Sequence, residues 1–242
     1  EVRRAWSLCQ RQGRDGCHVE PPRRSQGWSN KTLSDQVNRQ RILVACEESG
    51  RVRSALRRRG FDAWSCDLMP AHDGDRHHLQ CDVFDVLNDG WSGMLVFWPC
   101  TRLCNSGVRW LAERNLWHEM AESAHKFKRL LEYDAIPVRA MENPIPHKYA
   151  LQIIGSRYDQ IIQPWQYGHG ETKATCLWLR GLPRLVPTQI VSGRIGRIHM
   201  MPPGPRRSIE RSRTYPGIAD AMADQWGLIL AGGAPKARAT KL

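Results

Sequence analysis

The chain has 242 residues, of which 41% are hydrophobic and 25% charged, which is ordinary for a globular protein with one substantial core. No apolar stretch approaches the roughly 18 residues that a membrane helix needs, and no signal-peptide pattern opens the chain. A membrane-spanning or secreted protein is therefore not predicted. The eight cysteines include no CxxC pair, which favours a reduced, cytoplasmic compartment over a disulfide framework.

The net charge of +12 is concentrated in two segments. Residues 1–41 carry nine Lys and Arg against four Asp and Glu, and residues 180–213 carry eight Arg against one Glu. The remainder of the chain is neutral. Two basic segments on a neutral body indicate a polyanionic partner, with nucleic acid as the leading candidate. For residues 1–41, a merely solubilising role is an equal alternative.

Taken in chain order, residues 1–40 are polar and lack periodicity, and we predict a loosely ordered basic extension there. The folded domain is expected to span 41–230 and to be followed by a tail at 231–242. Short apolar runs predict its strands at 42–46, 62–66, 94–98, 136–141, 160–163 and 174–179.

Helical spacing of apolar residues predicts a helix between Gly50 and Gly60, a long amphipathic helix over 110–131 and a last helix over 218–230. A short element is expected around 83–87. Strands separated by segments of helical length predict an α/β fold with a mostly parallel sheet and helices on both faces.

A cysteine and a carboxylate follow two of the predicted strands. Pro99 and Cys100 come after the apolar run 94–98, and Glu142 comes after the run 136–141. The ends of parallel strands meet at the crevice where α/β proteins bind ligands. A carboxyl that is partly desolvated there has a raised pKa and can donate a proton at neutral pH, whereas the alternative for Glu142 is a turn cap.

Cys100 needs help to become a nucleophile, because an ordinary thiol is mostly protonated at neutral pH. Arg102, Lys173 or a helix beginning after Gly107 could supply the positive field. The alternative is an inert buried cysteine, a role that suits Cys104 better.

Two aspartates follow in a regular series. Asp67 closes the run 62–66, about 20 residues beyond the first turn, where an acid typically accepts hydrogen bonds from ribose hydroxyls. Asp82, at the third position, could contact an adenine. A helix cap or turn is the alternative for each. The first turn, residues 46–50, has a single glycine and no phosphate-binding pattern, which favours a ligand without pyrophosphate.

With these motifs in order, residues 41–228 resemble the DNA cytosine-5 methyltransferases, most closely a compact phage- and prophage-type branch. The resemblance is carried by Val44-Ala45-Cys46-Glu47-Glu48-Ser49-Gly50, Trp64-Ser65-Cys66-Asp67, Pro99-Cys100-Thr101-Arg102-Leu103-Cys104-Asn105-Ser106-Gly107, Glu142-Asn143-Pro144, Gly170-Glu171-Thr172-Lys173-Ala174-Thr175 and Thr214-Tyr215-Pro216-Gly217-Ile218-Ala219. The pair Pro-Cys and Glu-Asn-Pro in this order is the more specific part.

The resemblance implies a Rossmann-like fold that binds S-adenosyl-L-methionine and methylates C5 of a cytosine flipped out of DNA. In that family Cys100 would be the covalent nucleophile, Glu142 would protonate N3 of the ring, and Lys173 would contact the base. The other positions implied are, for the cofactor, Cys46, Glu47, Ser49, Gly50, Asp67, Asp82 and Pro99 and, for the substrate, Thr101, Asn105, Ser106 and Asn143. A phage- or prophage-encoded protein of the bacterial cytoplasm is expected, with no metal site.

Only residues 181–213 remain for target recognition, which is too short for the separate domain usual in the family. A catalytically inactive or regulatory DNA-binding relative is therefore the first alternative. A zinc-dependent nucleobase deaminase is a more distant one: His169-Gly170-Glu171 and Pro99-Cys100 exist, but in reverse order, and three residues rather than two separate Cys100 from Cys104. Oligomeric state is not predicted.

Overall fold

The computed structural model describes residues 40–202, 204 and 207–233, so the extension predicted for 1–40 lies outside it apart from Gln40, as does the tail after residue 233. Its strands are β1 (Arg41–Ala45), β2 (Ala63–Asp67), β3 (His78–Gln80), β4 (Trp91–Phe97), β5 (Val138–Pro144), β6 (Gln160–Ile162) and β7 (Thr175–Arg180). Its α-helices are α2 (Arg51–Arg58), α3 (Val83–Val86), α4 (Arg109–Glu113), α5 (Trp117–Leu131), α6 (Lys148–Ile154), α7 (Arg197–Met200), α8 (Arg207–Ser212) and α9 (Pro216–Leu230). Three 3-10 turns lie at η2 (Cys100–Arg102), η3 (Asn105–Gly107) and η4 (Pro164–Gln166).

The seven strands form one sheet in the order β3-β2-β1-β4-β5-β7-β6. Strands β1 to β5 are parallel, whereas β7 runs antiparallel to both β5 and β6. Chain order reverses between β1 and β4, which is the switch point where doubly wound sheets bind ligands. The predicted Rossmann-like, mostly parallel sheet with helices on both faces is confirmed; the antiparallel end was not predicted.

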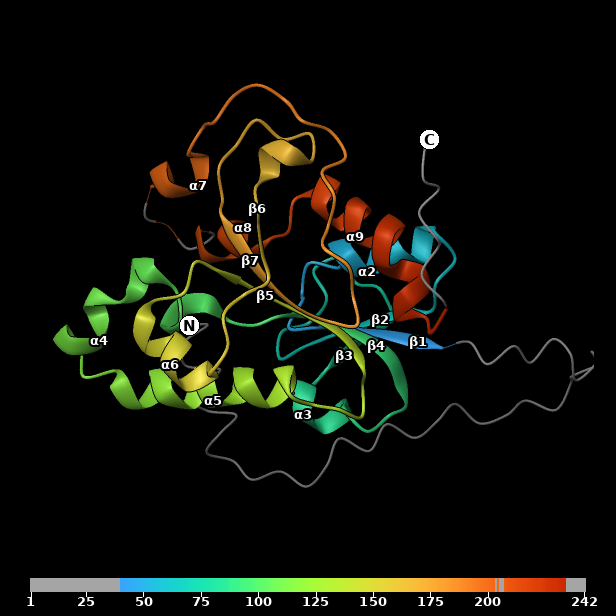
Figure 1. Cartoon of the computed structure of the whole chain (residues 1–242), viewed down its shortest axis with the longest axis horizontal. Coiled ribbons are helices and arrows are strands. Elements are labelled where there is room, and N and C mark those ends of the chain that lie inside the picture. The colour runs from blue at the N-terminus through green and yellow to red at the C-terminus, as the bar shows by residue number, and fades with distance from the viewer. Residues whose placement is uncertain (1–39, 203, 205–206, 234–242) are drawn as a thin grey trace, which may run out of the picture.

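Alternating side chains of β1 build both layers of the core. Ile42 and Val44 pack in a cluster with α2 and α9, and Leu43 and Ala45 pack in a cluster with α3, α5 and α6. All four are fully buried. Successive strand residues point to opposite faces, so a continuous apolar run is what a strand covered on both sides requires. Figure 1 shows α2 and α9 on one face of the sheet and α3, α5 and α6 on the other.

The single helix predicted over 110–131 is wrong, because the chain breaks between α4 and α5. Asn115 has φ of 50°, in the left-handed region that asparagine tolerates better than most residues. Leu116 then donates its N–H to the carbonyl of Leu111 at 2.9 Å, which closes α4. The apolar spacing continues across the break, so periodicity alone could not reveal it.

Strand β5 extends further than the run 136–141 predicts, so Glu142 and Asn143 lie inside the strand rather than after it. There Glu142 is paired between Phe97 of β4 and Leu177 of β7. Strand geometry therefore fixes the backbone of the candidate acid on both sides. Among the described residues, no helix is long and apolar enough to cross a membrane.

Candidate active site

A small cavity of about 90 Å³ lies at the carboxyl ends of β1, β4 and β5. Its walls come from residues 46–49 after β1, residues 97–100 at the end of β4, Glu142 of β5 and Lys173 before β7. Residues 211–214, which precede α9, complete the lining. The structure thus brings the three predicted catalytic residues to one cavity at the switch point of the sheet.

Glu142 and Lys173 form the acidic and basic sides of the cavity. Burial raises the pKa of the Glu142 carboxyl, while the charge of Lys173 and a hydrogen bond with Thr175 act in the opposite direction. The raised pKa favours the protonated acid. Lys173 is fixed by its backbone N–H, which donates to Gln163 at 3.0 Å, and by its Nζ, which donates to the Arg213 carbonyl at 3.3 Å.

Cys100 opens the 3-10 turn η2 directly after Pro99. Its thiol is hydrogen-bonded to that of Cys104, and this bond together with burial raises the pKa of Cys100. The same bond lowers the pKa of Cys104 to about 5, assisted by Ser106, whose Oγ lies 3.1 Å from the Cys104 sulfur. Within this pair, Cys104 is therefore the more acidic of the two thiols. Sequence reasoning took Cys104 for the inert one of the two.

Two of the three expected activators of Cys100 are placed differently from the prediction. Arg102 is bound to Glu119 at 2.8 Å on the surface, and the helix after Gly107 is the five-residue α4, which η3 separates from Cys100. The third expected activator, Lys173, has a positive charge that lowers the pKa of Cys100.

The loop after β1 carries a buried, strongly perturbed carboxyl. Glu47 is 5% exposed, and its Oε1 accepts hydrogen bonds from the Ser49 hydroxyl and, at 2.9 Å, from the Arg51 N–H. Burial raises its pKa to about 7. Its Oε2 is buried and has no hydrogen-bond partner among the described residues.

Gly50 ends this loop at φ of 69°, and an added Cβ would stand 2.3 Å from an oxygen of Asp73. Only glycine fits both the left-handed backbone and this close approach. Asp73 is itself paired with the fully buried Arg53, so Gly50 couples the loop to the β2–β3 connection.

Asp67 and Asp82 lie on the same edge of the sheet but outside the cavity walls. Asp67 accepts a hydrogen bond from the Met69 N–H at 2.9 Å, and burial raises its pKa. Asp82 caps α3 by accepting a hydrogen bond from the Phe84 N–H at 3.1 Å. This is the helix-cap role that the sequence offered as the alternative to an adenine contact. Both carboxylates act electrostatically on Cys46, raising its pKa together with burial, so they lie close to the loop after β1.

The predicted substrate residues do not line the cavity either. Thr101, Asn105 and Ser106 are exposed on the turns that follow Cys100. Asn143 is fully buried; its Nδ2 donates to the Pro144 carbonyl, and its Oδ1 has no partner among the described residues. Their roles as DNA contacts stay predictions.

Residues 211–214 are the part of the site that sequence reasoning missed. Arg51 donates to the Thr214 carbonyl at 2.7 Å, and Arg213 contacts His72 of the β2–β3 loop at 2.7 Å. With the Lys173 bond to the Arg213 carbonyl, the segment is tied to both rims of the cavity. No local pattern reveals such contacts, because they join residues between 40 and 163 positions apart.

No protein-family model matches the chain, and no curated protein matches it. Among solved structures, it is similar to a candidate DNA modification methyltransferase encoded within an E. coli prophage, with 14% identity, a TM-score of 0.42, and coverage of 68% of this chain and 55% of that one. It is also similar to a variant of Spodoptera frugiperda DNMT2, with 14% identity, a TM-score of 0.36, and coverage of 63% and 54%.

The chain thus spans about half the length of these two structures. At this identity and TM-score, neither likeness establishes an activity. Within the described part of the chain, no group of three or more His, Cys, Asp or Glu side chains is arranged to hold a metal ion.

Proposed function

We propose that this protein transfers a methyl group from S-adenosyl-L-methionine to C5 of cytosine in DNA, through a covalent bond to Cys100. The observation that carries the proposal is the convergence of Cys100, Glu142 and Lys173 on one cavity at the strand ends. A nucleophile, a carboxyl with a raised pKa and a cation are what addition to a pyrimidine ring requires. The motif order that resembles the cytosine-5 methyltransferases supports the same reaction.

In the proposed reaction, the Cys100 sulfur bonds to C6 of the flipped cytosine while the Glu142 carboxyl gives its proton to N3. The ring's C5–C6 double bond supplies the electron pair that makes C5 nucleophilic. C5 bonds to the methyl group as the bond from that group to the cofactor sulfur breaks. Solvent water then takes the C5 proton, the bond from C6 to sulfur breaks, and N3 returns its proton to Glu142. In this proposal the charge of Lys173 stabilises the negative charge that develops on the ring.

Cys100 must lose its own proton before it attacks. Cys104, when ionised, is the adjacent acceptor, because its sulfur is hydrogen-bonded to the Cys100 thiol. Transfer within this pair leaves the thiolate on Cys100 and the proton on Cys104. The charge of Lys173 favours that state, since it lowers the pKa of Cys100.

The residues of the site fit the proposed cofactor. The partnerless Oε2 of Glu47 would accept the ammonium group of its methionine half, and Asp67 would accept from the ribose. When bound, S-adenosyl-L-methionine supplies the electrophilic methyl group. Ligand pockets usually measure roughly 300–1,000 Å³, so a cavity of about 90 Å³ must widen before the whole cofactor can enter.

Trapping with DNA that contains 5-fluorocytosine tests the proposal. Fluorine cannot leave C5 as a proton does, so the full chain incubated with cofactor and this DNA should form a denaturation-resistant adduct that Cys100→Ser does not form. Transfer of a labelled methyl group to unmodified DNA is measured alongside. DNA binding without adduct or label would contradict the proposal and favour the non-catalytic DNA-binding relative.

A further inference from the structure

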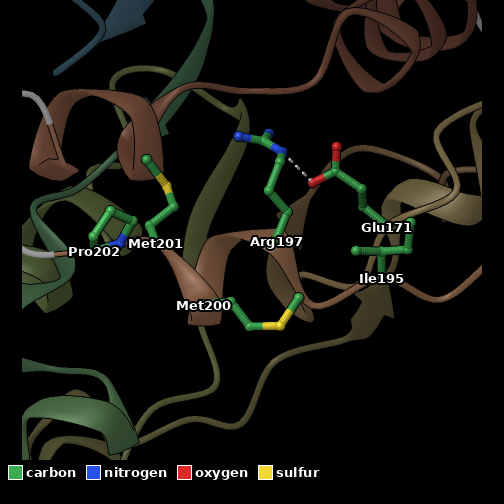
Figure 2. A pocket seen from close by; sticks show the side chains of 6 residues that line it. All are labelled: Glu171, Ile195, Arg197, Met200, Met201 and Pro202. Atoms are coloured by element: carbon green, nitrogen blue, oxygen red, sulfur yellow. Dashed lines mark hydrogen bonds and ion pairs between the residues drawn. The ribbon is translucent and has the colours of Figure 1, made fainter.

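A second, more open pocket of about 300 Å³ lies on the segment that precedes α8, within the basic stretch 180–213. Figure 2 shows its lining, which is apolar except for one ion pair. The residues are Glu171, Ile195, Arg197, Met200, Met201 and Pro202. The reaction proposed above uses none of them.

Arg197 is held in place rather than loose on the surface. Its Nε donates to Glu171 Oε2 at 2.9 Å, and the Tyr215 hydroxyl donates to the same oxygen at 2.6 Å. Its side chain is nevertheless 48% exposed, and Figure 2 shows the rest of the guanidinium directed away from the carboxylate. An arginine anchored through Nε can present its outer edge to a planar ligand without losing much side-chain entropy.

The apolar side chains of the pocket are unusually exposed. Ile195 is 60% and Met200 is 69% exposed, among the highest values for large hydrophobic residues in the described chain. Grouped apolar exposure next to fixed polar groups is typical of a binding surface. The pocket also lies in a segment with eight arginines and one glutamate, which selects a negatively charged partner.

The pocket adjoins the active-site cavity through one short loop. Glu171 faces the pocket and Lys173 lines the cavity, and two residues span no more than about 7 Å. Ile195 holds this loop in place through two backbone hydrogen bonds of 3.0 Å. The Thr172 N–H donates to the Ile195 carbonyl, and the Ile195 N–H donates to the Gly170 carbonyl.

We propose that this pocket reads a guanine close to the target cytosine, with Arg197 as the reading residue and Glu171 as its positioning residue. The inference rests on the proposed function in taking DNA as the substrate. Two N–H groups of an arginine match O6 and N7 of guanine, which is the commonest specific contact to a base. Ile195 and Met200 provide apolar contact beside it.

Selection of bound duplexes from a random-sequence library tests the inference without requiring catalysis. The full chain should enrich a guanine at one position by on the order of tenfold to a hundredfold, the usual discrimination of a bidentate arginine. Arg197→Ala should lose that enrichment, and Arg197→Gln should shift it toward adenine, which a glutamine amide matches. Glu171→Gln should weaken the preference. Arg58→Ala, an exposed arginine on α2 paired with Asp220, is the matched control and should keep it.

The same library is assayed for methylation by sequencing of 5-methylcytosine. Loss of the guanine preference in the Arg197 variants supports the inference whether or not methylation occurs, whereas absent methylation contradicts only the proposed function. A wild-type chain that binds DNA without a guanine preference, or not at all, overturns the inference. So does an Arg197→Ala variant that binds every sequence more weakly but keeps the preference, since Arg197 would then contact phosphate.

Discussion

The two pockets of this protein differ in how their side chains are held. The active-site cavity is built on the ends of β1, β4 and β5, and its ionisable groups are buried with displaced pKa values. The pocket around Arg197 is built on irregular chain and the four-residue helix α7, and its apolar side chains face solvent. A rigid sheet can hold reacting groups in one geometry, and a surface segment can present groups to a large partner.

This difference separates chemistry from recognition. Substitutions in the cavity are expected to reduce turnover with little change in which DNA is bound. Substitutions around the second pocket are expected to change which DNA is bound with little change in the chemical step.

The largest effect is expected for Glu142→Gln. An amide cannot protonate N3, so methyl transfer should fall by about a thousandfold, within the usual range for loss of a general acid. In the wild-type chain only the protonated acid is active, so the rate should decline as pH rises through the raised Glu142 pKa. Rates of label transfer across pH measure this, and the variant should lack the alkaline decline.

Binding of the same DNA to Glu142→Gln provides the control for this prediction, because the side chain is nearly isosteric and does not face the second pocket. Unchanged affinity with lost turnover fits the division. A variant with full turnover would mean that N3 receives its proton from another group.

A smaller effect, about a hundredfold, is expected for Cys104→Ser. Serine keeps the size of the side chain but is not ionised at neutral pH, so Cys100 loses its proton acceptor. The wild-type rate should rise with pH through the Cys104 pKa of about 5, and the serine variant should lack this acid limb. Pre-steady-state label transfer between pH 4.5 and 8 is the measurement. An unchanged acid limb would show that Cys104 does not take the proton.

The core of the sheet was readable from sequence because its physical signal is local. Each of β1, β4 and β7 contains a continuous run of four apolar residues, which is typical of a strand buried on both faces. Strand β3 has the sequence His-Leu-Gln and carries no such signal; it forms because residues 78–80 pair with β2. The break at Asn115 likewise depends on one residue's tolerance of a left-handed backbone.

The candidate site was predicted in part for a related reason. Cys100 and Glu142 follow or end apolar runs, so their common edge could be inferred from strand direction alone. The contact of Cys104 with Cys100 depends on how the chain turns after Pro99, and the lining by residues 211–214 depends on contacts across the whole chain. Neither turn geometry nor long-range packing is encoded in a local pattern.

Glu47→Gln should stabilise the protein at neutral and higher pH. The folded-state pKa of Glu47, about 7, lies above its ordinary value, so the folded state binds the proton more tightly than the unfolded state. Its favourable contribution is complete below about pH 4.5 and is lost as pH rises through 7. Glutamine does not titrate, so the variant's advantage in unfolding free energy should grow from near zero at low pH to about 3 kcal/mol at pH 8.

Urea unfolding at several pH values measures this difference, with the exposed Glu113→Gln on α4 as the control. An advantage that does not change with pH would contradict the shifted pKa. The same variant should bind cofactor more weakly, because the neutral amide offers an ammonium group no charge.

The smallest effect is expected for Arg194→Gln, three positions before Arg197. The Arg194 guanidinium lies 3.9 Å above the ring of Trp165, and one nitrogen donates to the Val191 carbonyl at 2.9 Å. Arg194 is stacked on Trp165 and does not line the pocket. We therefore expect it to attract the DNA phosphates and to make no hydrogen bond to a base edge. Its loss should weaken binding to all sequences by a few-fold and reduce the slope of log affinity against log salt by about one.

Arg194→Gln and Arg197→Gln are thus the sharpest pair for the recognition side of the comparison. They remove the same charge from the same segment, so any difference between them reports geometry. Fluorescence anisotropy over a salt series gives the slope, and library selection gives the preference. If both variants lose the guanine preference equally, recognition depends on the charge of the segment, and the pocket does not read a base.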